Sequence, residues 1–262
     1  MAFWSKKPAG AEPAASPGVE SPPPAAKAPP AAAVTPPAGA ACLVCGDALL
    51  GAGEAGCTLC GRTGVHPERC GRGHAVCDAC LDGPAADVIE RTCAASDERD
   101  PVALALRLLR HPRVRLGPAD HDQLVPSVLV AAWSTTRNEP GKRAVRVAEA
   151  RARAKAAPTV KLGRPDGRGA AAGAGAFVSL AAEASRGGAD AALAGKAVAR
   201  AQAIIGSGDD AACMRRNALV AVLAAARFAK DGLGTELSAR GFACENAGRN
   251  PSCVGAGCPF NR

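Results

Sequence analysis

Eight residues between positions 42 and 80 have the side chains and the spacing of metal ligands. They form four close pairs along the chain, in the order Cys42, Cys45, Cys57, Cys60, Cys70, His74, Cys77 and Cys80. A close pair on a tight turn can direct two ligand atoms at one ion, and two such pairs complete the tetrahedron that zinc prefers. The spacing therefore predicts two closed zinc sites, which would be structural because neither leaves a coordination position open.

The sequence leaves open which pairs share an ion. In a sequential arrangement, the first two pairs hold one zinc and the last two hold the other. In a cross-brace, the first pair shares an ion with the third, and the second with the fourth. The stretch "CGRGHAVCDAC", residues 70–80, resembles the middle of RING-type modules, and a helix after Cys80 would suit a treble-clef knuckle, so we favour the cross-brace. His66, just before the third pair, is expected to be a solvated loop residue.

Reduced thiols are expected in this chain rather than disulfides. A secretory signal has about 7–15 apolar residues after a charged start, and none follows the opening "MAFWSKK". No run approaches the roughly 20 apolar residues of a membrane span. The expected location is the cytoplasm, away from the membrane, where clustered cysteines bind metal more often than they form disulfides.

A second group of cysteines lies near the C-terminus. Cys244, Cys253 and Cys258 come from the last twenty residues, and Cys213 at a predicted helix start could supply a fourth thiolate. Four thiolates suit an iron–sulfur cluster or a third zinc. The alternative is a plain reduced tail. Cys93, which is expected to be buried in a helix, could replace Cys213 as a ligand.

One histidine stands between carboxylates ahead of an apolar helix. His121 and Asp122, in "GPADHDQ", could be an acid–base pair or metal ligands. The alternative is a helix-capping loop.

The composition predicts a mostly α fold. Hydrophobic residues make up 48% of the chain but aromatic residues only 3%, and alanine, the strongest helix former, supplies much of the apolar content. We expect a disordered Pro/Ala-rich tail over residues 1–40 and a double-zinc (treble-clef or RING-like) module over 41–83. An all-α domain over 84–240 and a cysteine-rich segment over 241–262 would follow.

Helix signals run through the predicted α domain. Asp100 and Pro101 have the types expected for an N-cap and a first helical residue. Pro126 must lie near the start of its helix or kink it, and Gly232 is expected to end the last helix. The Gly-rich run 163–176 lacks the Gly-Lys-Ser/Thr ending of a phosphate loop. It predicts either a flexible connector that permits close helix packing or an anion-binding helix start.

Most of the net charge comes from one stretch. Between Arg137 and Arg168 there are ten basic and three acidic residues, a net charge of +7 in a chain of +8. Such a patch could bind nucleic acid. We favour a solvated helix, because Glu149 can pair with Arg146 and Arg153 and no aromatic residues are interspersed for base stacking.

Five segments together resemble an uncharacterised prokaryotic domain family, found mostly in anaerobes and sometimes attached to radical-SAM or methyltransferase modules. They are "CLVCGDAL", "CGRGHAVCDAC", "DPVALALRLLRHPRVRLGPADHDQLVPSVLVAAW", "CMRRNALVAVLAAARFAKDGLG" and "CVGAGCPF". The resemblance covers about residues 42–260 and implies no established reaction. The family tends to carry two adjacent histidines where this chain has His121 and Asp122, and cysteines in the Gly-rich segment, so part of a site in relatives would be lost here.

Three functions are compatible with these features. The favoured hypothesis is a metal-binding accessory or regulatory protein that works with a protein partner. The second is an enzyme of one-carbon or radical-type metabolism that uses His121 and the C-terminal cysteines. The third is a nucleic-acid-binding protein that uses residues 137–168.

Overall fold

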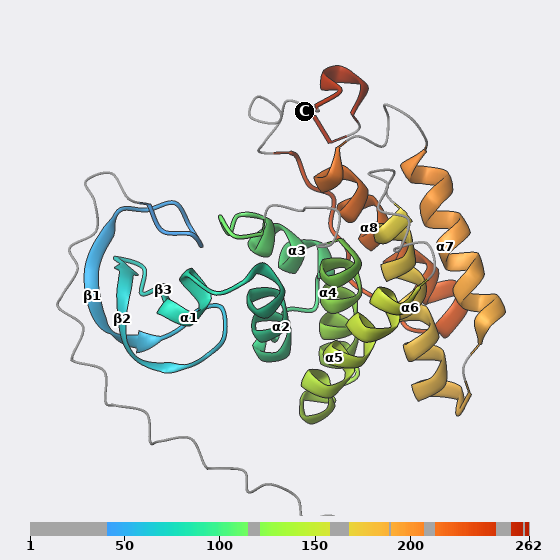
Figure 1. Cartoon of the computed structure of the whole chain (residues 1–262), viewed down its shortest axis with the longest axis horizontal. Coiled ribbons are helices and arrows are strands. Elements are labelled where there is room, and N and C mark those ends of the chain that lie inside the picture. Colours follow the sequence, from blue (N-terminus) through green and yellow to red (C-terminus); the bar gives the residue numbers. More distant parts are fainter. Residues whose placement is uncertain are drawn as a thin grey trace, which may run out of the picture. The chain divides into compact units, whose positions relative to one another are not determined.

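The chain is mostly α-helical, as predicted, and a small cysteine-rich module precedes the helices (Figure 1). The computed structural model describes residues 41–114, 121–157, 168–188, 190–206, 213–244, 253–258 and 260–261. The predicted tail of residues 1–40 lies outside this part of the chain. The helices are α1 (Asp78–Leu81), α2 (Ala85–Ala95), α3 (Pro101–Leu109), α4 (His121–Thr136), α5 (Pro140–Ala156), α6 (Arg168–Arg186), α7 (Ala191–Ile205), α8 (Met214–Leu233) and the short η3 (Gly255–Gly257).

The cysteine-rich module, residues 41–82, is built on three antiparallel strands. The strands β1 (Leu49–Gly56), β2 (Thr63–Cys70) and β3 (Ala75–Val76) pair in the order β1-β2-β3. The expectation for His66 was wrong, because it lies in β2 with 3% of its surface exposed. Its Nε2 lies 2.9 Å from the carbonyl oxygen of Arg62. An imidazole with a backbone partner can be buried at little cost.

Local chemistry sets the helix ends. The Asp100 carboxylate caps α3, accepting hydrogen bonds from the backbone N–H groups of Val102 (2.8 Å) and Ala103 (3.2 Å). The last long helix ends two residues later than predicted, at Leu233. Gly234, with φ 66°, takes the left-handed conformation that ends it, in place of Gly232.

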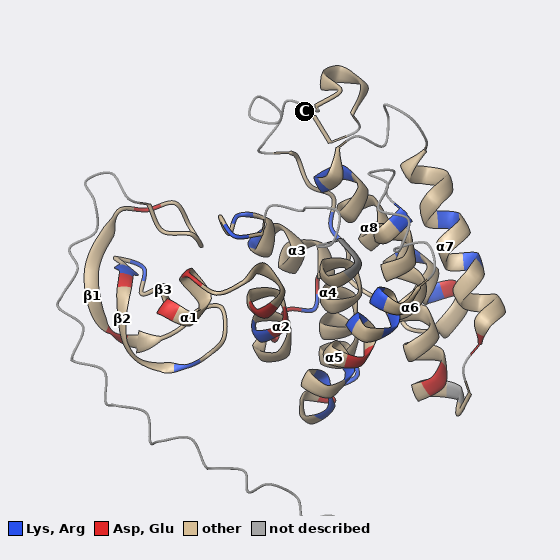
Figure 2. Cartoon of the chain, in the orientation of Figure 1, with Lys and Arg blue, Asp and Glu red and all other residues tan. Residues whose placement is uncertain are grey.

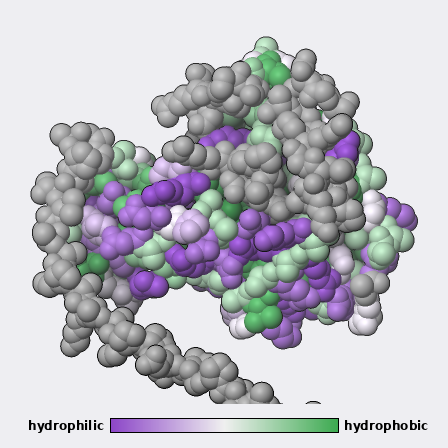
Figure 3. All heavy atoms as spheres, viewed as in Figure 1, coloured by the Kyte–Doolittle hydropathy of each residue, from purple (hydrophilic) through white to green (hydrophobic). Residues whose placement is uncertain are grey.

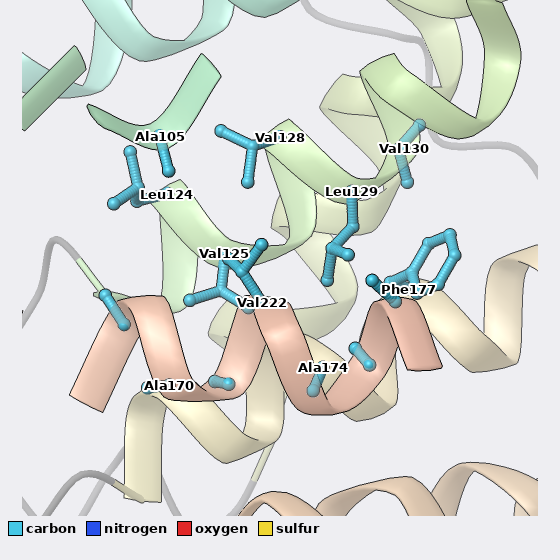
Figure 4. Close-up of a cluster of buried hydrophobic side chains, with 14 of the residues drawn as sticks. Ala105, Leu124, Val125, Val128, Leu129, Val130, Ala170, Ala174, Phe177 and Val222 are labelled. Carbon is cyan, nitrogen blue, oxygen red and sulfur yellow. The ribbon is translucent and has the colours of Figure 1, made fainter. Parts of the chain in front are cut away.

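Helix α4 lies at the centre of the helical part. It packs against α2, α3, α5, α6 and α8. Buried valine and leucine side chains of α4 point toward α3, α6 and α8 in Figure 4. Trp133 of α4 meets Phe177 of α6 edge to face, with 6.5 Å between ring centroids. A helix buried on all sides needs apolar residues around its whole circumference, which explains the continuous apolar run around Pro126.

The second half of the Gly-rich run 163–176 forms helix, where the sequence had suggested a flexible connector. Residues 168–176 form the first turns of α6, while 163–167 lie outside the described residues. A Cβ on Gly173 would lie 2.8 Å from Cδ of Pro126 and 3.0 Å from Cβ of Val125. Gly175 leaves similar room for Val198 of α7. These glycines therefore allow α6 to approach α4 and α7 closely, which is the packing role expected of the run.

Most basic side chains of α5 are held in ion pairs. Glu139 pairs with Arg137 at 3.0 Å, Lys142 at 3.1 Å and Arg146 at 2.8 Å. Figure 2 shows several basic segments and one acidic segment along α5, and the visible face over α4 and α5 in Figure 3 mixes hydrophilic with hydrophobic residues. Arg143 is buried and donates to the carbonyl oxygen of Ala94 at 2.8 Å. The expected pair of Glu149 with Arg153 is present, whereas Arg146 pairs with Glu139 instead, and residues 158–167 of the basic stretch lie outside the described residues.

Candidate metal centres

The first candidate centre joins the first and third ligand pairs. Side-chain ligand atoms of Cys42, Cys45, Cys70 and His74 all lie within 4.8 Å of one another. The Sγ atoms of Cys45 and Cys70 are 3.7 Å apart, and Cys70 Sγ is 3.6 Å from Nδ1 of His74. Four sulfur ligands about 2.3 Å from a tetrahedral ion lie about 3.8 Å from one another. The spacing in this group therefore suits a zinc-sized ion.

The second candidate centre joins the second and fourth pairs. The Sγ atoms of Cys57, Cys60, Cys77 and Cys80 lie within 4.8 Å of one another, and those of Cys60 and Cys77 are 3.7 Å apart. The grouping in both centres is that of a cross-brace. The predicted helix begins slightly earlier than expected, because Cys80 lies within α1 rather than before it.

Tight turns aim the paired ligands. The backbone N–H of Gly46 donates to the carbonyl oxygen of Cys42 at 2.8 Å, and Gly61 repeats this contact with Cys57 at 2.7 Å. Both glycines have positive φ, 80° and 74°, a conformation that costs other residues steric strain. Backbone N–H groups also point at sulfur, from Val44 to Cys42 Sγ and from Cys77 to Cys57 Sγ, each at 3.4 Å. Such donors stabilise thiolates, the form that binds metal.

Close thiols in the second centre cannot all ionise without a cation. The hydrogen bond with Cys80 lowers the pKa of Cys57 to about 4, and the same contact raises the pKa of Cys80. Negative charge on one thiolate makes the next proton harder to remove. A bound divalent cation would remove this conflict, since it stabilises every thiolate that contacts it.

The module contacts the helices through arginine side chains. Arg91 of α2 donates to the carbonyl oxygen of Ala79 at 2.6 Å, and Arg110, which follows α3, donates to that of Val44 at 3.3 Å. Next to Arg110, His111 is buried with 3% exposure, and burial lowers its pKa. Sequence reasoning passed over His111, because a single histidine in "LLRHPR" has no neighbouring ligand type.

All four C-terminal cysteines line one cavity. Cys213, Cys244, Cys253 and Cys258 line one pocket, part of which is open to solvent, at the N-terminus of α8. We call it the C-terminal cysteine pocket. Cys213 and Cys258 are buried, and the other two are half-buried. All twelve cysteines of the chain are described, and none forms a disulfide.

Two sets of contacts bring the chain end back to α8. The backbone N–H of Arg240 donates to Oδ2 of Asp100 at 3.1 Å, so one carboxylate caps α3 and also anchors the segment after α8. Phe242 and Phe260 stack at 4.4 Å between ring centroids, and the Cys244 N–H donates to the Phe260 carbonyl oxygen at 2.6 Å. These contacts place Cys244 and Cys258 beside the same helix start.

The other candidate residues do not join this pocket in the described part of the chain. His121 opens α4, but its side chain and that of Asp122 lie outside the described residues. Cys93 is fully buried in α2 and does not line the pocket. Burial raises the pKa of its thiol. Within the described residues, no helix is both long and apolar enough to cross a membrane.

The structure is a helical domain preceded by a module with two groups of candidate metal ligands, and it has a further group of cysteines near its C-terminal end. A family model matches residues 89–261, well over half of the 262-residue chain, and its description is family of unknown function (DUF5714). The chain therefore belongs to this family. The matched region begins after the cysteine-rich module, although the resemblance was expected from residue 42, and it includes the C-terminal cysteine pocket. Neither the curated proteins nor the solved structures gave a match.

Proposed function

We propose that this chain is a zinc-containing accessory or regulatory protein whose cysteine-rich module holds two structural zinc ions. The observation that carries the proposal is the division of eight side chains into two groups of four, each with its ligand atoms within 4.8 Å of one another. Thiolate and imidazole in a tetrahedral arrangement favour zinc over the harder magnesium and calcium ions.

An accessory role suits closed centres. Four protein ligands occupy every position of a tetrahedral ion, so no position remains for a substrate or a reactive water. Zinc would instead hold the β1-β2 hairpin and α1 in place, because the small apolar cluster of the module consists mostly of the ligands themselves. We therefore propose that the protein acts by binding a protein partner, and that the rigid zinc-containing module provides a binding surface for it.

The proposal is tested by metal analysis of the full chain and of one ligand variant. We expect about two zinc ions per chain. Cys77→Ser should release the ion of the second centre and keep the other. A full zinc content in Cys77→Ser would contradict the assignment.

Cys93→Ser is the matched control for this test. Cys93 is equally buried but lies in α2, outside both groups. This variant should lose stability, since a hydroxyl replaces a buried thiol, and still retain both zinc ions. Zinc loss in the control would show that metal content reports general unfolding.

A further inference from the structure

The C-terminal cysteine pocket differs from the two zinc-type centres in the distances between its sulfurs. In each zinc-type centre, all four ligand atoms lie within 4.8 Å of one another. Among the described residues, no three of the C-terminal cysteines satisfy that limit, although all four line one cavity. The thiols therefore surround a space rather than converge on a point.

We propose that this pocket binds an iron–sulfur cluster with four irons and four sulfides. Zinc needs its ligand sulfurs about 3.8 Å apart. A cube of iron and sulfide holds its four cysteine sulfurs roughly 6 Å apart, because each sulfur binds a different iron. Four thiols that line one pocket, with no three of them within 4.8 Å of one another, suit the wider spacing of the cube better than that of a single ion.

The other pocket residues suit a soft, anionic group. The described lining contains no carboxylate and no imidazole. Apart from the cysteines it is mostly apolar, and its polar residues are Arg215, Arg216 and Asn261. Arg215 donates to the carbonyl oxygen of Leu109 at 2.6 Å and Arg216 to that of Ile205 at 2.9 Å. Because the acceptor of Arg215 is neutral, its guanidinium charge can offset part of the negative charge of the thiolates.

The start of α8 adds to this positive potential. Cys213 is the N-cap of α8, which runs for 20 residues. The unpaired N–H groups and aligned dipoles of a helix start favour negative charge within the first turn. A thiolate at Cys213 and the cluster bound to it would lie in that field. Two ferrous ions, two ferric ions and four sulfides from solution form the cluster on four thiolates with release of the four thiol protons, so no electron is gained or lost in assembly.

The chain end closes around the pocket through a tight turn. Cys258 follows η3, and its backbone N–H donates to the carbonyl oxygen of Gly255 at 3.0 Å. Gly255 has φ 58°, which a residue with a side chain adopts only with strain. The stacked Phe242 and Phe260 rings form part of the wall. Apolar walls limit the access of water, which affects both the lifetime and the reduction potential of such clusters.

The test is anaerobic purification of the full chain, followed by reconstitution with equal amounts of ferrous and ferric iron and with sulfide. We expect about four iron and four sulfide ions per chain and broad visible absorption that dithionite bleaches. Zinc should stay at the level found in the absence of iron, which separates this proposal from that for the module. A third zinc with no iron, or a Cys213–Cys244 disulfide with no metal, would overturn the cluster assignment.

Two variants and one control locate the cluster. Cys253→Ser and Cys258→Ser should each lose more than half of the iron and most of the visible absorption while they keep zinc and helical circular dichroism. Cys77→Ser should keep the iron and lose zinc. Cys253 is half-buried, so its replacement is the milder test of folding. Full iron content in folded Cys253→Ser and Cys258→Ser chains would refute the site.

Discussion

Glu139 is the residue that balances the charge at the start of α5. Its carboxylate accepts from Arg146, Arg137 and Lys142, and these hydrogen bonds hold its pKa at about 2, well below the ordinary value of 4.5. The guanidinium groups of Arg137 and Arg146 also lie 5.0 and 4.7 Å from the Trp133 ring centroid. The carboxylate therefore positions two cations over an aromatic ring of the core.

Glu139→Gln should lower stability at neutral pH and have little effect in strong acid. A carboxylate with a depressed folded-state pKa stabilises the fold above its unfolded pKa, and this contribution is lost as pH falls through the folded value, here between about 4.5 and 2. We expect a loss of about 1 kcal/mol at pH 7, since partial exposure weakens the pairs. Urea unfolding of the parent and the variant at pH 7 and near pH 2 measures the difference in free energy of unfolding at each pH.

Glu149→Gln is the control for this prediction. Glu149 pairs with Arg153 alone in the described network, and 46% of its side chain is exposed. Its replacement should change stability at pH 7 by a few tenths of a kcal/mol at most. Equal losses in the two variants would show that the three-cation arrangement at Glu139 has no special role.

For single residues, the spacing of cysteines along the sequence predicted their role better than the surrounding sequence predicted the burial of other side chains. The four close pairs predicted the ligand groups because a CxxC turn constrains its two sulfurs locally. The burial of His66 was missed because it depends on the pairing of β2 with its neighbours, and "TGVHPER" shows no clear alternation. The sequence could not show that Cys213 and Cys258 lie at the same pocket. Their proximity depends on contacts of Asp100 and Phe260 with residues distant in sequence or at the chain end.

At the level of elements, glycine has opposite effects on α6 and α7. Gly173 lies where α6 crosses α4, and a Cβ there would meet Pro126 and Val125 at 2.8 and 3.0 Å. Gly195 lies on the exposed side of α7, where a Cβ would meet nothing within 4 Å. The same substitution in two helices therefore separates packing from helix propensity.

Gly173→Ala should destabilise the chain and Gly195→Ala should stabilise it. Overpacking at a tight helix crossing costs about 1–3 kcal/mol, whereas alanine in place of an exposed helical glycine gains up to about 1 kcal/mol. Chemical denaturation of the two variants beside the parent measures both signs. Stabilisation by Gly173→Ala would mean that the α4–α6 crossing has room for a methyl group.

The helices were predictable as elements, while their exact extent was less so. Asp100 and Pro101 marked the start of α3 correctly because capping chemistry is local. The Gly-rich run at the start of α6 was predicted as a connector or a helix start rather than as full helical turns, since glycine is a poor helix former in isolation. In this fold its lack of a side chain is compensated by close contact with α4 and α7.

At the scale of the whole molecule, the buried apolar side chains of the described residues form two separate clusters. One lies among the helices, and the other is the small cluster of Cys57, Leu59, Val76, Cys77 and Cys80 in the module. Polar contacts such as Arg91 to Ala79 and Arg113 to Asp82 join the two parts. Exposed ion pairs of this kind contribute little to stability, so the two parts should respond differently to metal removal.

Zinc chelation should unfold the module and leave the helical part folded. Without metal, the module has only its small cluster to offset the entropy of ordering about forty residues, whereas zinc binding would contribute on the order of 10 kcal/mol per site. The helical cluster contains no proposed zinc ligand. Chelation in the presence of reductant should therefore preserve most of the helical circular dichroism. It should also make the module cleavable by trypsin at Arg62, Arg69 and Arg72, because cleavage needs an unfolded backbone around the site. Arg143, with 6% exposure, should stay protected.

The same chelator presaturated with zinc is the control. Loss of helical signal in step with zinc release would instead show that the module and the helices fold as one cooperative unit.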